Sequence, residues 1–68
     1  MTWNYRVKLE DGTFVIVEAY YNEDGKLTAT TEDSVGAVGD SLEGLRQSLL
    51  MMLQAVEDVH NLKTEVLK

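Results

Sequence analysis

Glu18 is the residue of this sequence that acid–base chemistry would most readily use, because it interrupts the apolar and aromatic segment over residues 14–21. A carboxyl group buried among such side chains has a raised pKa and can act as a general acid. Tyr5 and Tyr20 would then lie beside it at a small pocket. In the alternative interpretation, Glu18 lies at the rim of a sheet and its carboxylate is bonded to a hydroxyl group. One carboxylate without a nucleophile or a partner base is weak support for catalysis, so we expect that the protein is not an enzyme.

The other residues with chemical potential are few. The chain has no cysteine and one histidine, His60, which excludes a thiolate or multi-histidine metal site. We interpret His60 as a helix-end residue that either bonds the last carbonyl groups or complements the helix dipole. Gly36 and Gly39 precede a helix start, where backbone N–H groups can bind an anion, but Asp40 and Glu43 at this helix end oppose one. We therefore expect no metal and no cofactor.

The charge of the chain bears on its partners. Asp and Glu outnumber Lys and Arg by 12 to 6, which gives a formal net charge of −6. This excess would repel phosphate groups, so we expect no nucleic-acid partner. It either keeps the protein in solution or attracts a basic protein partner, and composition does not choose between the two.

Length and hydropathy are typical of a small globular protein. The 68 residues form a single domain over residues 1–68, and such a domain is marginally stable without disulfides, metals or oligomerisation. Because the chain has no cysteines, the remaining means of stabilising it are oligomerisation or an unusually well-packed core. The sequence contains no run of about 18 apolar residues, which is the length needed to span a membrane, and the N-terminus lacks the apolar stretch of a signal peptide. We therefore expect a cytoplasmic protein that forms a homo-oligomer, most simply a dimer.

Two hairpin signals organise the N-terminal half. Alternation of apolar and polar residues over residues 3–9 predicts a half-buried strand. Asp11-Gly12 follows, and Asp-Gly between alternating runs predicts a two-residue turn that sets Tyr5 opposite Glu18. Seven side chains then share the face that we expect to be the core layer: Trp3, Tyr5, Val7, Leu9, Phe14, Ile16 and Tyr20.

A second Asp-Gly pair, Asp24-Gly25, predicts a second hairpin by the same rule. It sets Tyr20 opposite Ala29 and predicts a third strand over residues 26–31. The expected fold class is therefore α+β, with a three-stranded antiparallel meander and one amphipathic helix packed on one face of it.

The helix is expected to start near residue 41 and to run to about residue 58, with Asp40 or Ser41 as its N-cap. With Asp40 as the cap, Glu43 completes a capping box; with Ser41 as the cap, Glu43 lies in the first turn, where the helix dipole favours an acid. Asn61 is the expected stop. One apolar stripe is expected to cover the sheet: Leu42, Leu45, Leu49, Met52, Leu53, Val56 and Val59.

The middle of this helix is more apolar than one stripe requires, since residues 49–53 are apolar on all sides. Leu50 lies outside the stripe and Met51 lies nearly opposite it. Met51 belongs to a second stripe of mostly small residues, which lets another backbone approach closely. We therefore predict a protein interface there, with self-association as its simplest form, and expect Met51→Glu to dissociate it. The predicted interface residues are Gly44, Ser48, Leu50, Met51 and Ala55.

Residues 59–68 leave three alternatives open. Leu62, Thr64 and Val66 alternate as in a short fourth strand, whereas Leu62 and Val66 alone fit a helical extension. We favour the third alternative, a loosely ordered tail.

The small-residue loop at residues 35–39, followed by the helix opening Asp40-Ser41-Leu42-Glu43, carries a resemblance. A meander of strands, such a loop and such a helix resemble the HicB-like antitoxin family over about residues 3–58. Residues 1–6 and 51–53 look like small stand-alone bacterial proteins of that group. The chain departs from the family at Val35 and Ala37, where Pro and Cys are usual, and in a shorter loop.

The resemblance implies a reduced ribonuclease-H-like sheet carrying one helix. It implies no nuclease activity, because the metal-binding carboxylate cluster of ribonucleases H has no counterpart in this sequence. It also implies a small basic protein partner such as a HicA-like toxin. We therefore expect a non-enzymatic protein-interaction module that self-associates. The alternative is a homo-oligomeric structural or regulatory protein without a toxin partner.

Overall fold

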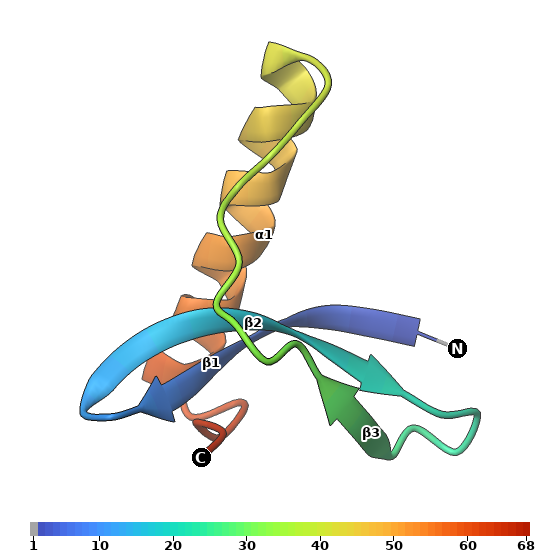
Figure 1. Cartoon of the computed structure of the whole chain (residues 1–68), viewed down its shortest axis with the longest axis vertical. Helices are drawn as coiled ribbons and strands as arrows, with labels where there is room; N and C mark the ends of the chain where they lie inside the picture. The colour runs from blue at the N-terminus through green and yellow to red at the C-terminus, as the bar shows by residue number, and fades with distance from the viewer. Residues whose placement is uncertain (1) are drawn as a thin grey trace.

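The structure of the chain, a computed structural model, describes residues 2–68. Three strands, β1 (Thr2–Glu10), β2 (Thr13–Tyr21) and β3 (Leu27–Thr30), form one antiparallel sheet in the order β1-β2-β3. One helix, α1 (Leu42–His60), follows. Figure 1 shows the helix rising from the sheet at a steep angle. The α+β class and the meander are confirmed.

The first hairpin follows the predicted register. Tyr5 lies opposite Glu18, and Leu9 opposite Phe14. Both turn residues have a positive φ, 50° at Asp11 and 81° at Gly12. These angles match the twist of the flanking strands, which is why Asp-Gly specifies so tight a connection.

The second hairpin differs from its prediction at the turn. Tyr20 lies opposite Ala29 as expected, but a bulge follows and Tyr21 pairs with Leu27. The side-chain oxygen of Asn22 accepts hydrogen bonds from the backbone N–H groups of Asp24 (2.9 Å) and Lys26 (3.0 Å). These bonds stabilise a longer turn than the two-residue turn that the Asp-Gly rule gives. β3 is correspondingly shorter than the expected strand.

The most deeply buried side chains lie on the face of the sheet that the sequence did not assign to the core. Val17 and Ala19 of β2 have an exposed fraction of 0%. Arg6, which pairs with Val17, donates hydrogen bonds to the Tyr21 hydroxyl (2.9 Å) and to the carbonyl oxygen of Glu65 (2.9 Å). These bonds hold the C-terminal segment beside this face. The expected single core layer is therefore wrong: both faces contribute, and Phe14 of the expected layer is 66% exposed.

The C-terminal segment returns to the free edge of β1. The helix ends at His60 with Asn61 as its C-cap, as predicted. Leu67 then forms an isolated parallel bridge with Lys8. The Leu9 N–H donates to the Leu67 carbonyl (2.8 Å), and the Leu67 N–H donates to the Val7 carbonyl (2.9 Å). Of the three alternatives, a fourth strand is the nearest to this arrangement, although only one residue pairs.

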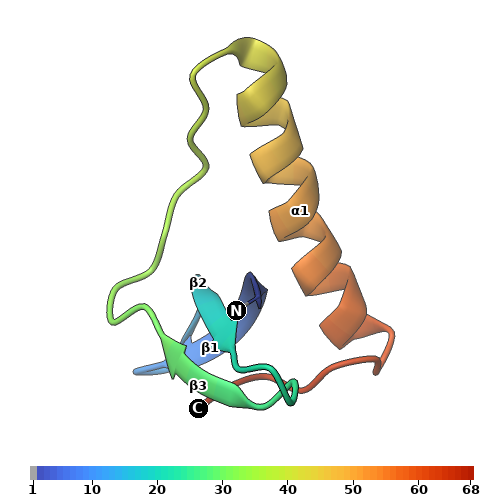
Figure 2. The same cartoon turned by 90° about the vertical axis from the view of Figure 1, so that its right-hand side faces the viewer.

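Helix α1 contacts the sheet through its C-terminal half alone. Ala55, which is buried, lies with Tyr5 of β1 in one groove, and Val59 lies with Val7 of β1 in another. Figures 1 and 2 show that the N-terminal half extends beyond the sheet. Leu42, at this far end, is 87% exposed. The expectation that the leucine stripe covers the sheet is therefore wrong.

The connection at residues 31–41 explains where the helix lies. It continues from β3 beside β2, where the Val35 N–H donates to the Ile16 carbonyl at 2.9 Å, and then rises to meet the helix at its N-terminal end (Figure 2). The Ser48 hydroxyl donates to the Val38 carbonyl at 2.7 Å. Because the connection itself packs on α1, it occupies a side of the helix that a sheet could otherwise cover.

Candidate functional site

The start of α1 is set by its cap. Ser41 has an extended backbone, and its hydroxyl accepts a hydrogen bond from the Gly44 N–H at 3.0 Å. Ser41 is therefore the N-cap, and Asp40 is not. Glu43 lies in the first turn, where its charge is favourable to the dipole.

The side of α1 that faces the rest of the chain, its inner face, carries the small residues. Gly44 and Ser48 lie against the connection, and Ala55 lies against β1. These are three of the five residues predicted as a protein interface. In the structure, these small side chains let the backbone of the same chain approach the helix. The sequence pattern predicts a close approach of a backbone but does not say whether it belongs to the same chain or to another molecule.

The two other predicted interface residues remain accessible. Leu50 and Met51 are each 46% exposed. Met51 lines a groove between α1 and β1 with Asn4 and Tyr5, so it lies at the border of the inner face. Leu50 lies on the other side of the helix. The five residues predicted as one interface therefore lie on two sides of α1, with Leu50 apart from the other four.

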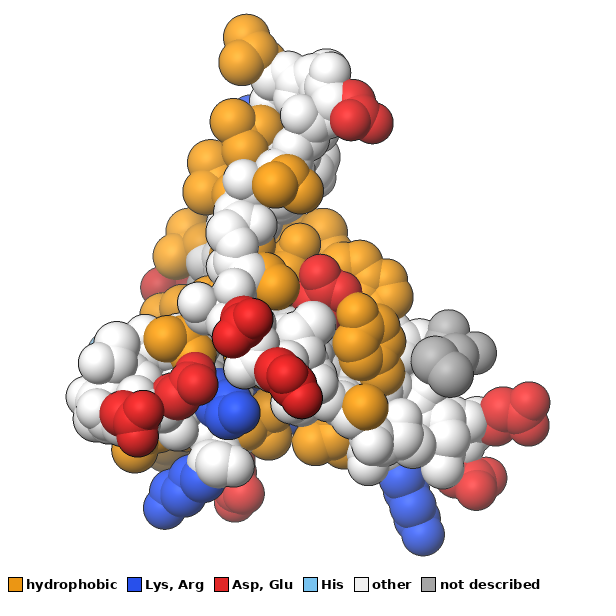
Figure 3. Space-filling view, viewed as in Figure 1, with side chains coloured by type: hydrophobic (Ala, Val, Ile, Leu, Met, Phe, Trp, Pro, Cys, Tyr) orange, Lys and Arg blue, Asp and Glu red, His pale blue; other side chains and the backbone are white. Residues whose placement is uncertain are grey.

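The opposite side of α1 forms an exposed, mostly apolar surface, which we call the outer face. Its members are all at least 45% exposed: Leu42, Leu49, Leu50, Leu53 and Val56. Figure 3 shows hydrophobic side chains following the helix from its far end down to the sheet. Four of the five belong to the stripe that the sequence assigned to the core. Their spacing correctly predicted that these side chains share one face of the helix, but not that this face is exposed instead of covered by the sheet.

The outer face ends in an apolar groove next to the sheet. The groove has a volume of about 230 Å³. It is lined by Val7, Phe14, Val56, Val59, His60 and Val66. Phe14, on β2, is among the most exposed large apolar side chains of the described residues. The groove was not predicted, because it joins three segments that are distant in the sequence.

Charged residues lie within and beside the outer face. At 100° per residue, Arg46 and Glu57 project between Leu53 and Leu50, and Glu43 lies beyond Leu50 towards the polar side of the helix. Arg46 Nη1 lies 3.6 Å from Glu43 Oε1, and both side chains are largely exposed. Such a surface pair contributes little to stability, so Arg46 is free to change partners.

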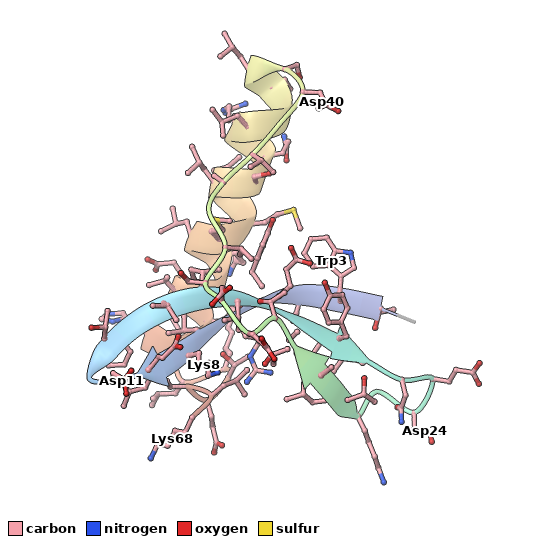
Figure 4. All side chains as sticks on the ribbon, viewed as in Figure 1. Trp3, Lys8, Asp11, Asp24, Asp40 and Lys68 are labelled. Atoms are coloured by element: carbon pink, nitrogen blue, oxygen red, sulfur yellow. The ribbon has the colours of Figure 1, made fainter. Side chains whose placement is uncertain are left out.

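Glu18 is bonded to a hydroxyl group, as the second interpretation of this residue has it. It lies at intermediate exposure and accepts a hydrogen bond from the Tyr20 hydroxyl. This bond, together with partial burial and the negative charge of Glu18, raises the pKa of Tyr20 above its ordinary value of 10.0. Trp3 and Tyr5 pack edge to face beside them, with ring centroids 5.1 Å apart (Figure 4). The pairing Tyr5–Glu18 that the sequence predicted is present, and it forms part of an aromatic cluster.

The remaining candidate residues are separate from one another. His60 is exposed at the end of α1, while Gly39 lies at the opposite end against the helix backbone. Among residues 2–68, no group of three or more His, Cys, Asp or Glu side chains is placed to hold a metal ion. Within the same part of the chain, no helix has the length and apolar character needed to cross a membrane.

In comparisons with known proteins, no family model, curated protein or solved structure matches this chain.

Proposed function

We propose that this chain is a protein-interaction module that self-associates through the outer face of α1. The observation that supports the proposal is the row of exposed apolar side chains along α1, Leu42, Leu49, Leu50, Leu53 and Val56, which Arg46 interrupts. Contiguous apolar patches of this extent are uncommon on monomeric proteins and mark interaction surfaces.

The size of the core supports the same proposal. Among residues 2–68, the buried apolar residues are Val7, Val17, Ala19 and Ala55, all of them small. A domain of this length without disulfides gains little from so small a core. Covering the outer face against a second copy would remove further apolar surface from water, at about 25 cal/mol per Å². Self-association therefore supplies burial that one copy lacks.

Solution mass at several concentrations, by sedimentation equilibrium, tests the proposal. We expect a dimer for the unaltered chain and dissociation in Leu53→Glu, which places a charge in the outer face. Gln47→Glu, which changes an exposed residue on the far side of the helix, serves as the control. A clean monomer at high micromolar concentration would contradict the proposal.

A second variant separates the outer face from the interface that the sequence predicted. If the small-residue stripe mediates association, Met51→Glu dissociates the dimer and Leu53→Glu does not. If the outer face mediates it, Leu53→Glu dissociates the dimer and Met51→Glu does not. Circular dichroism of each variant shows that the helix is retained.

A basic partner is a second candidate, supported by the acidic surface. Acidic pairs occupy the two hairpin turns and the segment after β3: Glu10 and Asp11, Glu23 and Asp24, Glu32 and Asp33. Figure 3 shows acidic side chains around the sheet. This distribution, together with the resemblance to HicB-like antitoxins, supports binding of a small basic protein such as a HicA-like toxin on a reduced ribonuclease-H-like fold. Co-purification with a candidate toxin at low and high salt tests it: binding should weaken with salt, and no binding at low salt would contradict it.

A further inference from the structure

We infer that two copies of the chain pair through their outer faces with the α1 helices antiparallel, and that Leu42 of each copy enters the apolar groove of the other. The inference rests on the proposed self-association and adds the orientation and the contacts. Three independent features of the helix lead to it.

The first feature is the symmetry of the exposed ridge. Six residues on the side of α1 away from the inner face recur at intervals of four and three: Leu42, Arg46, Leu49, Leu53, Val56 and His60. Their order is symmetric about residue 51. In an antiparallel pair with its two-fold axis at that level, Leu49 of one copy lies beside Leu53 of the other. Leucines then meet leucines at the centre, which gives the self-complementary contact that a two-fold interface requires.

The second feature is the match between the two ends of the outer face. Leu42, almost fully exposed, marks one end, and the groove at Phe14, Val56 and His60 marks the other. The helical rise separates Leu42 from His60 by about 27 Å. The same symmetry brings Leu42 of the second copy to the level of His60, and so over the groove. In a parallel pair, Leu42 of one copy would lie beside Leu42 of the second copy, and neither groove would be filled.

The third feature is the charge along one flank. In an antiparallel two-fold pair, each flank of a helix lies beside the same flank of the other helix. Arg46 and Glu57 share a flank and lie five and six residues from the centre, so each Arg46 lies within about 1.5 Å, the rise of one residue, of the level of Glu57 of the second copy. In a parallel pair, Arg46 would instead face the flank that carries Leu45 and Met52. Exposed ion pairs add little affinity, but complementary charge selects one orientation over another.

Cysteine cross-linking tests the orientation, because the natural chain has no cysteine. Arg46→Cys and Glu57→Cys are made as two separate variants, and each is oxidised alone and in an equimolar mixture. In the antiparallel pair, Cys at position 46 of one variant lies beside Cys at position 57 of the other. Two copies of the same variant hold their thiols about 15 Å apart along the helix axis at position 46 and about 18 Å apart at position 57, well beyond the Cα separation that a disulfide allows.

The expected result is a disulfide-linked dimer in the mixture and in neither variant alone. A mixture of Gln47→Cys with Glu57→Cys, in which position 47 lies on the far side of α1, should give no such product. Cross-linking of either variant with itself would contradict the antiparallel placement and overturn the inference. A dimer by native mass spectrometry without any cross-link would overturn it too, while leaving self-association intact. A monomer by mass would overturn both proposals.

As a second measurement, the double charge exchange Arg46→Glu with Glu57→Arg is compared with each single change. The single changes place like charges beside each other in the antiparallel pair, so each should raise the dimer dissociation constant, and the double change should restore it. Single changes without effect, or a double change no tighter than the singles, would contradict the placement of Arg46 beside Glu57 of the second copy.

Discussion

Gly39, in the connection that precedes α1, lies directly against the backbone of Gly44 in the first turn of the helix. A Cβ added to Gly39 would lie 2.6 Å from the carbonyl carbon of Gly44 and would also overlap the backbone of Leu45. One turn further along, the Ser48 hydroxyl donates to the Val38 carbonyl. The connection and the helix therefore pack backbone to backbone, and this contact fixes the inner face of α1.

Gly39→Ala should destabilise the protein, because the overlapping atoms are backbone atoms that cannot turn aside. We expect a loss of about 1–3 kcal/mol in the free energy of unfolding, typical of overpacked sites. Gly36→Ala is the matched control, since a Cβ there meets no atom within 4 Å. Denaturant unfolding of the two variants measures the difference, and equal stabilities would show that the connection does not pack as described.

Ser41→Ala should weaken the start of α1, because it removes the hydroxyl that accepts from the Gly44 N–H. The expected loss is about 1 kcal/mol, and Ser41→Asp should largely retain the cap. Asp40→Ala is the control for the alternative cap and should change stability by less than Ser41→Ala. If Asp40→Ala costs more than Ser41→Ala in thermal unfolding, Asp40 is the cap.

The bond from Tyr20 to Glu18 should make part of the stability depend on alkaline pH. The hydrogen bond to Glu18, partial burial and the negative charge of Glu18 raise the pKa of Tyr20 above 10.0 in the folded state. The folded protein therefore holds this proton more tightly than the unfolded chain. The contribution is complete below pH 10 and is lost as the pH rises through the raised pKa.

Spectrophotometric titration of tyrosinate checks this prediction. Glu18→Gln removes the charge and should lower the pKa of Tyr20 towards 10.0. Glu23→Gln, which changes an exposed carboxylate in the second turn, should leave the titration as it is. Identical titration curves for the protein and Glu18→Gln would show that Glu18 does not control Tyr20.

Arg6→Met should release the C-terminal segment from the sheet. The change removes an exposed hydrogen bond to the Glu65 carbonyl and a partly buried one to the Tyr21 hydroxyl, and a partly buried hydrogen bond of a charged group contributes about 1.5–3 kcal/mol. Hydrogen exchange at the Leu9 and Leu67 amides, which bond across the bridge, should become faster. Lys26→Met, at an exposed position in the second turn, is the control. Unchanged protection of both amides in Arg6→Met would contradict this role of Arg6.

The sequence by itself determined the features that neighbouring residues specify. Asp11-Gly12 specified the first turn, and with it the whole register of β1 against β2, because the turn leaves only one alignment that keeps like side chains on one face. The helix, its stop at Asn61 and the choice of two caps followed from similar short signals. The second turn is longer than predicted because the Asn22 side chain accepts hydrogen bonds from the backbone as far as Lys26. These bonds favour the longer turn over the two-residue turn that the Asp-Gly pair alone predicts.

Only the tertiary structure decided which faces are covered. Residues 49–53 are apolar on all sides, so the helix offered two faces to the sheet, and leucine content favoured the one that remains exposed. Burial instead followed closeness of approach: Gly44, Ser48 and Ala55 let the connection and β1 come near, which bulkier leucines would prevent. In the same way, Arg6 and the returning C-terminal segment cover Val17 on the face of the sheet opposite the predicted core layer. Periodicity ranks the faces of an element by apolar content, whereas shape and chain connectivity determine which face another part of the chain can reach.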